Sequence, residues 1–348
     1  MREIQSIEIR DEAQVGAARR AVHDYADHIG FGETELAEID IVVQEIGTNA
    51  ATYAAQGGWL HYTTTLGDTP GLELFYWDSG PGIYDLDRAI RDGVSTSGSL
   101  GSGLGAIRRL MEEFDVYSTV KQAARVADMR RTTHGTALLA RKWVAGARSS
   151  SPTADGIMTE RIGVWARPHP GESSCGDAYF IRVHDGLTLL AVIDGLGHGS
   201  GAKEAADVAL DSLSEWTGEP LDEILMAVHN ALRATRGAVM SAAIIDRAGS
   251  RLYCAGVGNV AVRVFDAPEP VNPIPANGTL GARLGRVRVW TYPWAEGATV
   301  VMASDGLSAS WEIGSYPGLL KRNPQLVAGV LMRDYGRNGD DATVLVAR

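Results

Sequence analysis

The chain has little cysteine, no long apolar run and few basic residues, and each shortage excludes a class of protein. Its two cysteines, Cys175 and Cys254, are too few and too far apart for a disulfide framework or a cysteine metal site. No apolar run approaches the roughly 20 residues that cross a bilayer. The first residues lack the apolar stretch of a signal peptide. We therefore expect a cytoplasmic protein without a membrane partner.

Basic residues are outnumbered by acidic ones, 32 to 43, which gives a formal net charge of -11. Nucleic acids and anionic membranes bind basic surfaces, so we expect no nucleic-acid partner. A hydrophobic content of 45% is ordinary for a globular protein, and 348 residues are enough for two domains.

One break in composition divides the chain. Small, polar and helix-breaking residues dominate from 146 to 156, and no hydrophobic period persists there. This pattern predicts a first domain over 1–145, a linker over 146–159 and a second domain over 160–348. Both domains have an ordinary size.

The hydrophobic patterns favour an α+β fold in both domains. In the first, apolar spacing predicts helices over 35–55 and about 106–114, and strands over 59–65, 72–77, 116–120 and 136–140, as in an α/β sandwich. In the second, eight strands are predicted, over 178–184, 187–193, 240–246, 250–257, 260–265, 286–291, 298–303 and 342–347. Helices are expected there only over 201–216, 220–235 and 317–334. Such a strand-rich pattern indicates antiparallel sheets flanked by helices.

Three weak signals for a nucleotide pocket occur in order in the first domain. Glu45 and Asn49 lie four residues apart, on one side of the expected helix, where they could activate an attacking group and ligate magnesium, or form a solvated polar face. Asp78 ends an apolar strand before Gly80 and Gly82, where it could accept a hydrogen bond from adenine or simply begin a turn. A glycine-rich run precedes the next helix, where backbone N–H groups can bind phosphate, although a flexible linker is the alternative; its glycines are Gly98, Gly101, Gly103 and Gly105.

Four aspartate motifs define the second domain. Asp194 and Asp305 each follow an apolar strand and precede a glycine, whereas Asp177 and the pair Asp340–Asp341 follow a glycine and precede a strand. A single Asp-Gly pair is usually a turn. Strand ends can converge on one edge of packed sheets, however, and two carboxylates about 4 Å apart repel by about 4 kcal/mol at an effective dielectric near 20. Divalent cations relieve this repulsion, and oxygen ligands favour Mg²⁺ or Mn²⁺.

The first set of motifs resembles the GHKL ATPase superfamily, in particular the RsbT-type serine/threonine kinases of bacterial partner switching. The resemblance covers about 1–143 and depends on the stretches 78–83, 92–98 and 104–114. It implies that Glu45 is the general base, that Asn49 is the ligand of an ATP-bound Mg²⁺, and that Asp78 contacts adenine with Thr136 nearby. The glycines would shape the ATP pocket and its lid. Two departures are Gly105-Ala106 and a long basic segment over 121–133.

The second set resembles the PPM (type 2C) metal-dependent protein phosphatases, most closely RsbX-like enzymes. The motifs at 175–180, 194–200, 256–259, 304–307 and 339–343 occur in the order of that family and cover about 160–348. The resemblance implies two Mn²⁺ or Mg²⁺ ions, held by Asp177, Asp194, the Gly195 carbonyl, Asp305 and Asp340, with Asp341 beside them. The fold expected is a PPM-type αββα sandwich. His198 is a candidate general acid or an ordinary loop histidine.

Together, the resemblances imply a bifunctional serine/threonine kinase and phosphatase of partner switching. Its partners would be STAS-domain proteins of the RsbS and RsbR kind, and a downstream phosphatase or sigma-factor regulator. The alternative is that the first domain is an ATP-dependent anti-sigma or docking module and that only the phosphatase is catalytic.

Overall fold

The computed structural model describes residues 2–54, 56–91, 103–120, 134–147, 161–172 and 174–348. These residues form two compact units, which we describe separately. One comprises residues 2–160 with 312–330, and the other comprises residues 161–311 with 331–348. The expected linker over 146–159 lies almost wholly outside the described residues, so its boundaries stay a prediction.

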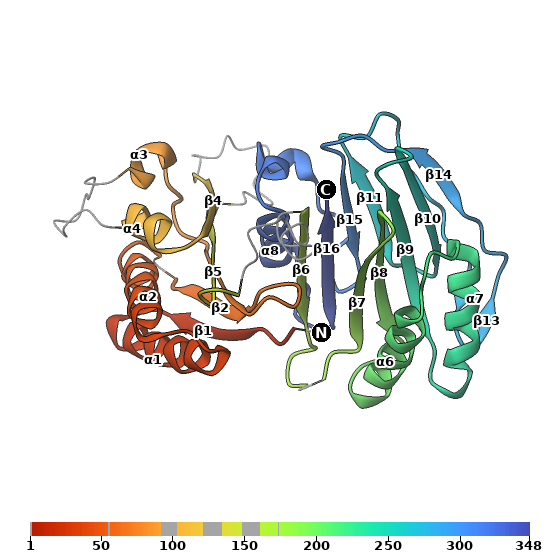
Figure 1. Cartoon of the computed structure of the whole chain (residues 1–348), viewed down its shortest axis with the longest axis horizontal. Coiled ribbons are helices and arrows are strands. Elements are labelled where there is room, and N and C mark those ends of the chain that lie inside the picture. The colour runs from red at the N-terminus through yellow and green to blue at the C-terminus, as the bar shows by residue number, and fades with distance from the viewer. Residues whose placement is uncertain (1, 55, 92–102, 121–133, 148–160, 173) are drawn as a thin grey trace. The chain divides into compact units, whose positions relative to one another are not determined.

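The first unit contains one antiparallel sheet with helices packed on a face of it (Figure 1). The order of its strands is β1-β2-β3-β5-β4. Their bounds are β1 Gln5–Ile9, β2 Gly58–Thr64, β3 Gly71–Asp78, β4 Glu113–Thr119 and β5 Gly135–Trp143. The helices are α1 Glu12–Ile29, α2 Glu33–Tyr53, α3 Leu86–Ile90 and α4 Gly103–Leu110.

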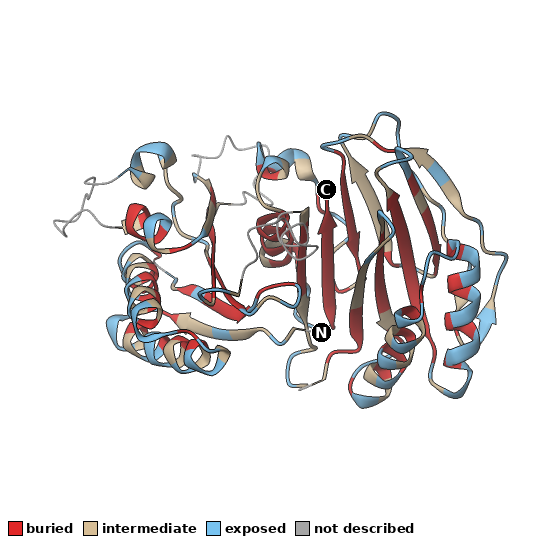
Figure 2. Ribbon diagram, in the orientation of Figure 1, coloured by how far each residue is buried: buried red, intermediate tan, exposed pale blue. Residues whose placement is uncertain are grey.

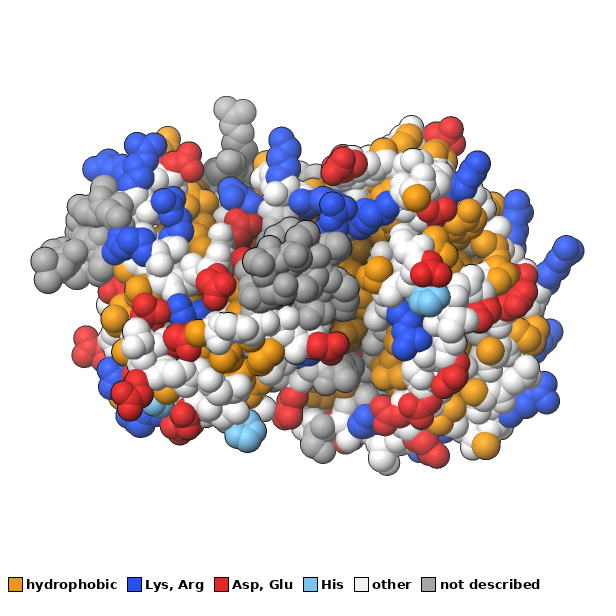
Figure 3. All heavy atoms as spheres, viewed as in Figure 1, with side chains coloured by type: hydrophobic (Ala, Val, Ile, Leu, Met, Phe, Trp, Pro, Cys, Tyr) orange, Lys and Arg blue, Asp and Glu red, His pale blue; other side chains and the backbone are white. Residues whose placement is uncertain are grey.

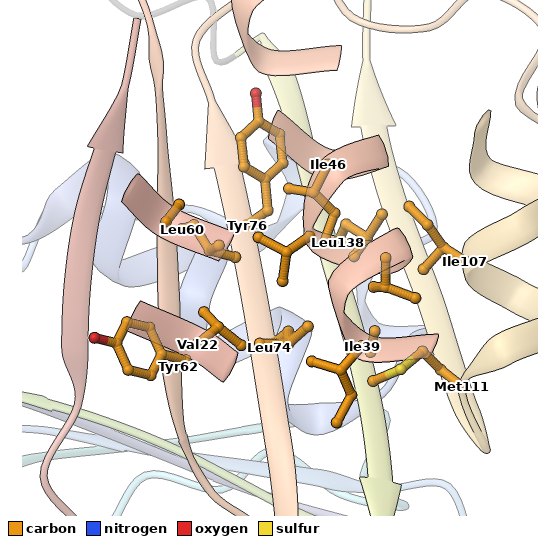
Figure 4. Packing of buried hydrophobic residues seen from close by; sticks show 14 of the residues in the cluster. Val22, Ile39, Ile46, Leu60, Tyr62, Leu74, Tyr76, Ile107, Met111 and Leu138 are labelled. Carbon is orange, nitrogen blue, oxygen red and sulfur yellow. The ribbon is translucent and has the colours of Figure 1, made fainter. Parts of the chain in front are cut away.

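The core of this unit lies between the sheet and the helices (Figure 4). Alternation along β2 and β3 turns Leu60, Leu74 and Tyr76 toward Ile39 and Ile46 of α2, and all five are buried. Helices α1 and α2 approach closely because α2 has a glycine at Gly47, where a Cβ would lie 2.6 Å from Val15. The packing of α2 fixes which of its side chains reach the sheet edge.

The second unit contains two antiparallel sheets, ordered β14-β10-β9-β8-β7 and β11-β15-β16-β6, with contacts from β15 and β16 to β7 and β8. The strands of the first are β7 Asp177–His184, β8 Leu187–Gly195, β9 Ala238–Asp246, β10 Arg251–Val257 and β14 Trp290–Pro293; those of the second are β6 Ile162–Arg167, β11 Ala261–Phe265, β15 Thr299–Ala303 and β16 Ala342–Ala347. A small hairpin joins β12 Gly278–Thr279 to β13 Arg283–Leu284.

Helices α6 Ser200–Ser214 and α7 Leu221–Ala231 pack on the larger sheet through alanine and leucine side chains. The central strands of both sheets are buried along their length (Figure 2). The expected α+β architecture, with one sheet and helices in the first unit and two antiparallel sheets with helices in the second, is therefore confirmed.

Three local predictions were wrong. The helix expected over 317–334 is α8 Pro324–Tyr335, because the side chain of Asn323 caps Gln325 N at 2.9 Å and proline is favoured in a first helical turn. The strand expected over 286–291 forms only from Trp290 onward. The helix expected to continue to 114 ends at Leu110, and β4 begins at Glu113, since tertiary pairing with β5 outweighs the local pattern.

The sequence analysis also missed α1, β1 and β6. A start signal for α1 was present, because Asp11 accepts a hydrogen bond from Gln14 N at 3.0 Å as an N-cap. Gly30 ends the helix with φ of 106°, the left-handed conformation that glycine adopts readily. Within the described residues, no helix is long and apolar enough to cross a membrane.

Candidate functional sites

A cavity of about 320 Å³ opens in the first unit between α2, β3, β5 and α4. Six of the predicted site residues line it: Glu45, Asn49, Asp78, Gly82, Gly103 and Thr136. Its size is within the range of small-ligand pockets. Gly80 lies beside it through a bond to Asp78, and Gly105 is buried within α4. Gly98 and Gly101 lie outside the described residues.

Helix α2 contributes the polar wall of this cavity. Glu45 and Asn49 are four residues apart, and both are half-buried. The residue after each of them, Ile46 and Ala50, packs in the core. Thr52 and Tyr53 extend the same wall by one turn, because side chains three and four residues apart lie on one side of a helix. The arrangement places a carboxylate and a carboxamide together at the mouth of the cavity.

Backbone N–H groups from two segments hold the Asp78 carboxylate in place. Its Oδ1 accepts bonds from Gly80 N at 2.7 Å and from Thr136 N at 3.2 Å. Gly135 permits this approach: its φ is +127°, and a Cβ there would lie 2.1 Å from the Asp78 carbonyl oxygen. Burial and the neighbouring Asp78 carboxylate raise the pKa of Tyr76, a cavity residue.

The second unit gathers the predicted aspartates at one end of its two sheets. Asp177 begins β7 and lies directly opposite Asp194, near the end of β8, in the antiparallel register. Asp305 follows β15, and Asp340 and Asp341 precede β16. Two aspartates in direct cross-strand pairing destabilise a sheet by repulsion. The sequence therefore maintains an unfavourable arrangement at this edge.

Burial and mutual repulsion act on the protonation of these carboxyls. Burial and then the neighbouring Asp194 hold the pKa of Asp177 well above its usual range. Burial, followed by Asp305 and Asp340, raises the pKa of Asp194 to about 7. Burial and Asp305 also raise the pKa of Asp340. Burial and mutual repulsion therefore disfavour the ionised forms of Asp177, Asp194 and Asp340.

Neutral donors orient the aspartates. Ser304 Oγ donates to Asp177 Oδ2 at 2.5 Å and itself accepts from Thr343 N at 2.9 Å. Asn259 Nδ2 donates to Asp305 Oδ2 at 2.9 Å. Ser304 and Asn259 belong to the motifs at 304–307 and 256–259 but were not among the predicted site residues. Ser304 directly precedes Asp305, which was the available signal, whereas the motif of Asn259 contains no aspartate.

The residues fit a divalent cation in their chemistry, since all the side chains gathered here are carboxylates. Asp341 Oδ2 is buried and has no hydrogen-bond partner among the residues that the structure describes, although Asp341 Oδ1 accepts from His169 N at 2.7 Å. Gly176 leaves room beside it, since a Cβ there would lie 2.8 Å from that orphan oxygen. Among the described residues, no three acidic, histidine or cysteine side chains surround a single point as they stand. The carboxylates are gathered at one edge rather than closed around an ion.

His198 lies on the exposed loop after β8, outside the aspartate cluster. Its Nδ1 is 3.2 Å from Glu172 Oε1, and its ring stacks on His169 with centroids 5.1 Å apart. The link to the aspartates is indirect, through His169 N and Asp341. The two cysteines, in contrast, are buried free thiols.

Comparison with known proteins separates the two halves in the same way. Residues 9–131 match the histidine kinase-like ATPase domain family, and residues 184–348 match the stage II sporulation protein E (SpoIIE) family. The chain is 33% identical to the serine/threonine-protein kinase RsbT of Bacillus subtilis over 120 residues, which are 34% of this chain and 90% of that kinase. Through its first domain the chain belongs to the RsbT kinase family.

The second half is similar to phosphatases. The chain is 29% identical to the phosphoserine phosphatase RsbX of Bacillus subtilis over 140 residues, 40% of this chain and 70% of RsbX. A solved structure described as part of the bacterial stressosome, a modular system adapted to control secondary messenger signalling, aligns with a TM-score of 0.52 and 31% identity over 54% of this chain and 98% of that one. The chain thus joins an RsbT-like, ATP-binding serine/threonine kinase domain to an RsbX-like, metal-dependent phosphatase domain.

Proposed function

We propose that this protein phosphorylates and dephosphorylates serine or threonine residues of STAS-domain regulators, and so catalyses both of the opposing reactions of partner switching. The observation that carries the proposal is the presence of two separately built sites in one chain. One is a cavity lined by Glu45, Asn49 and Asp78, and the other is a cluster of five aspartates. The sites share no residue, so the two reactions are distinct.

In the kinase site, Glu45 would accept the proton of the attacking serine or threonine hydroxyl. The hydroxyl oxygen would form a bond to the γ-phosphorus of ATP while the bond from that phosphorus to the bridging oxygen of the β-phosphate breaks. Asn49 would hold the Mg²⁺, which neutralises the charge of the phosphates when bound. Asp78, with its Oδ1 fixed by two backbone donors, would recognise adenine. Gly82, Gly103 and Gly105 would allow the backbone to approach the nucleotide.

In the phosphatase site, Asp177, Asp194, the Gly195 carbonyl, Asp305 and Asp340 would hold two Mn²⁺ or Mg²⁺ ions, with Asp341 beside them. Such ions supply an activated water and compensate the phosphoryl charge. Ser304 and Asn259 keep two of the carboxylates oriented. His198 would give a proton to the leaving serine or threonine oxygen, and its Glu172 partner would keep its ring oriented.

The partner is proposed from the relatives, since RsbT and RsbX are a kinase and a phosphoserine phosphatase and the aligned structure is a stressosome component. A regulator of the RsbS or RsbR kind would present its serine or threonine to each site in turn. A downstream phosphatase or a sigma-factor regulator would then respond to the phosphorylation state.

The test uses the full chain with STAS-domain proteins encoded beside it and ATP labelled at the γ-phosphate. Label should enter a serine or threonine with Mg²⁺ present, and it should be released as inorganic phosphate when Mn²⁺ is added. Capture of a sigma factor that depends on ATP, without label transfer, would instead favour the docking-module alternative. Absence of both label transfer and release would overturn the proposal.

A further inference from the structure

Arg236 lies against the loop that follows Asp194 in the second unit. The loop after Asp194 is tied to the segment of Arg236 by a bond from Leu196 N to Gly237 O at 3.0 Å. Gly195 also pairs with Ala238 in the β8–β9 register. Two ladder contacts therefore fix the backbone of Arg236 beside this loop.

The guanidinium of Arg236 extends along the loop over its glycines. A Cβ at Gly197 would lie 3.3 Å from Arg236 Nη1, and a Cβ at Gly201 would lie 2.6 Å from Arg236 Nε. These glycines flank His198, the candidate general acid. The side chain therefore lies against the loop that follows Asp194.

Arg236 is exposed and makes no ion pair or side-chain hydrogen bond with any residue that the structure describes. Two other arginines of this unit have partners: Arg263 donates to the carbonyls of Trp311 and Ala309, and Arg182 donates to that of Trp216. Lys203, in helix α6, is paired with Asp207. Arg236 thus keeps its guanidinium available beside the loop that follows Asp194.

A phosphate monoester carries up to two negative charges and would approach a cluster that is itself acidic. A guanidinium is planar and always charged, and it donates two parallel hydrogen bonds to phosphoryl oxygens. We propose that Arg236 binds the phosphoryl oxygens of the substrate and positions them at the aspartate cluster. The inference rests on the proposed phosphatase function and adds a substrate-binding residue to it.

The test compares Arg236→Ala and Arg236→Lys with Arg233→Ala, an exposed arginine of the preceding turn with no side-chain partner among the described residues. Hydrolysis of p-nitrophenyl phosphate is measured with Mn²⁺. We expect Arg236→Ala to raise KM by about 10- to 100-fold, as loss of a charged hydrogen-bonded pair does. Arg236→Lys should recover part of the loss, and Arg233→Ala should stay near wild type.

A binding measurement separates this inference from the function on which it rests. The affinity of inorganic phosphate for the Mn²⁺-treated protein, measured by calorimetry, should fall in Arg236→Ala by a similar factor, whether or not the ester is hydrolysed. Equal phosphate affinity in wild type and Arg236→Ala would overturn the proposal. So would an effect confined to a phosphoprotein substrate, because it would place Arg236 against the protein rather than the phosphate. A wild type that binds phosphate but hydrolyses nothing would count against the phosphatase function alone.

Discussion

The two candidate sites differ in how they treat charge. The cavity of the first unit is assembled from neutral backbone donors around one aspartate, with Glu45 and Asn49 on its rim. The site of the second unit places aspartates directly opposite one another and buries Asp177 and Asp341. A pocket of the first kind is stable when empty, whereas a cluster of the second kind is relieved by bound cations. The net charge of the chain says little about either site, because acidic and basic side chains lie among one another on the face shown in Figure 3.

The largest expected effect is the loss of phosphatase activity in Asp194→Asn. This change removes a carboxylate from the centre of the cluster. Its effect should exceed the roughly 10- to 100-fold cost of losing a residue that only orients a ligand. Hydrolysis of a phosphoprotein with Mn²⁺ measures it, and ATP binding should persist. Asp222→Asn on the exposed face of α7 is the matched control. Loss of both phosphatase activity and ATP binding in Asp194→Asn would contradict the model of two separate sites.

Asn49→Ala is the complementary change in the cavity. Transfer of phosphate to a STAS-domain protein should fall at least about 100-fold, since the Mg²⁺ loses a protein ligand and transition-state charge loses its compensation. Dephosphorylation should be unchanged. Asn230→Ala, on the exposed side of α7, controls for the loss of a carboxamide. Retained transfer would show that the Mg²⁺ ligand has been assigned wrongly.

Ser304→Ala should have a smaller effect on the phosphatase. Ser304 touches Asp177 but would not itself hold a metal, so we expect a loss of about 10-fold in activity and in affinity for Mn²⁺. Metal titration followed by activity measures both quantities, with Ser212→Ala on α6 as the control. A loss as large as that of Asp194→Asn would place Ser304 among the ligands instead.

The last expected effect concerns stability rather than activity, and it depends on a buried histidine of the first unit. Burial lowers the pKa of His61 to about 3, and its Nδ1 lies 2.7 Å from Ser6 Oγ. The unfolded chain binds a proton below about pH 6.5 while the folded chain does not. Stability of this unit should therefore decrease as the pH falls from 6.5 toward 3, by up to about 1.4 kcal/mol per pH unit.

Thermal unfolding between pH 7 and 4, monitored by tryptophan fluorescence, measures this slope. Trp59 and Trp77 lie near His61, with ring centroids 6.3 and 4.4 Å away, so their emission reports on this part of the sheet. In His61→Gln the slope should be shallower by the contribution of one proton. The same slope in both proteins would refute the assignment of the acid sensitivity to His61.

The sequence predicted the two sites unequally. The four aspartate motifs each combine a turn with an apolar strand, and the strand ends do meet at one edge. The nucleotide pocket needed the order of its motifs, because each piece alone also fits a turn, a linker or a polar helix face. Tyr76, Leu104 and Leu138 line the cavity but were not predicted, since nothing local distinguishes them from other core residues.

The sequence by itself indicated two domains and the α+β class, and it determined which carboxylates and glycines are available for chemistry. These follow from local periodicity and from motifs of a few residues. Only the tertiary structure decided three contacts. Asp177 faces Asp194, Thr136 N donates a hydrogen bond to Asp78, and the Arg236 side chain lies against the loop after Asp194. Each of these depends on strand register or on the approach of distant segments. Such contacts arise from packing across the whole domain, which no short stretch of sequence encodes.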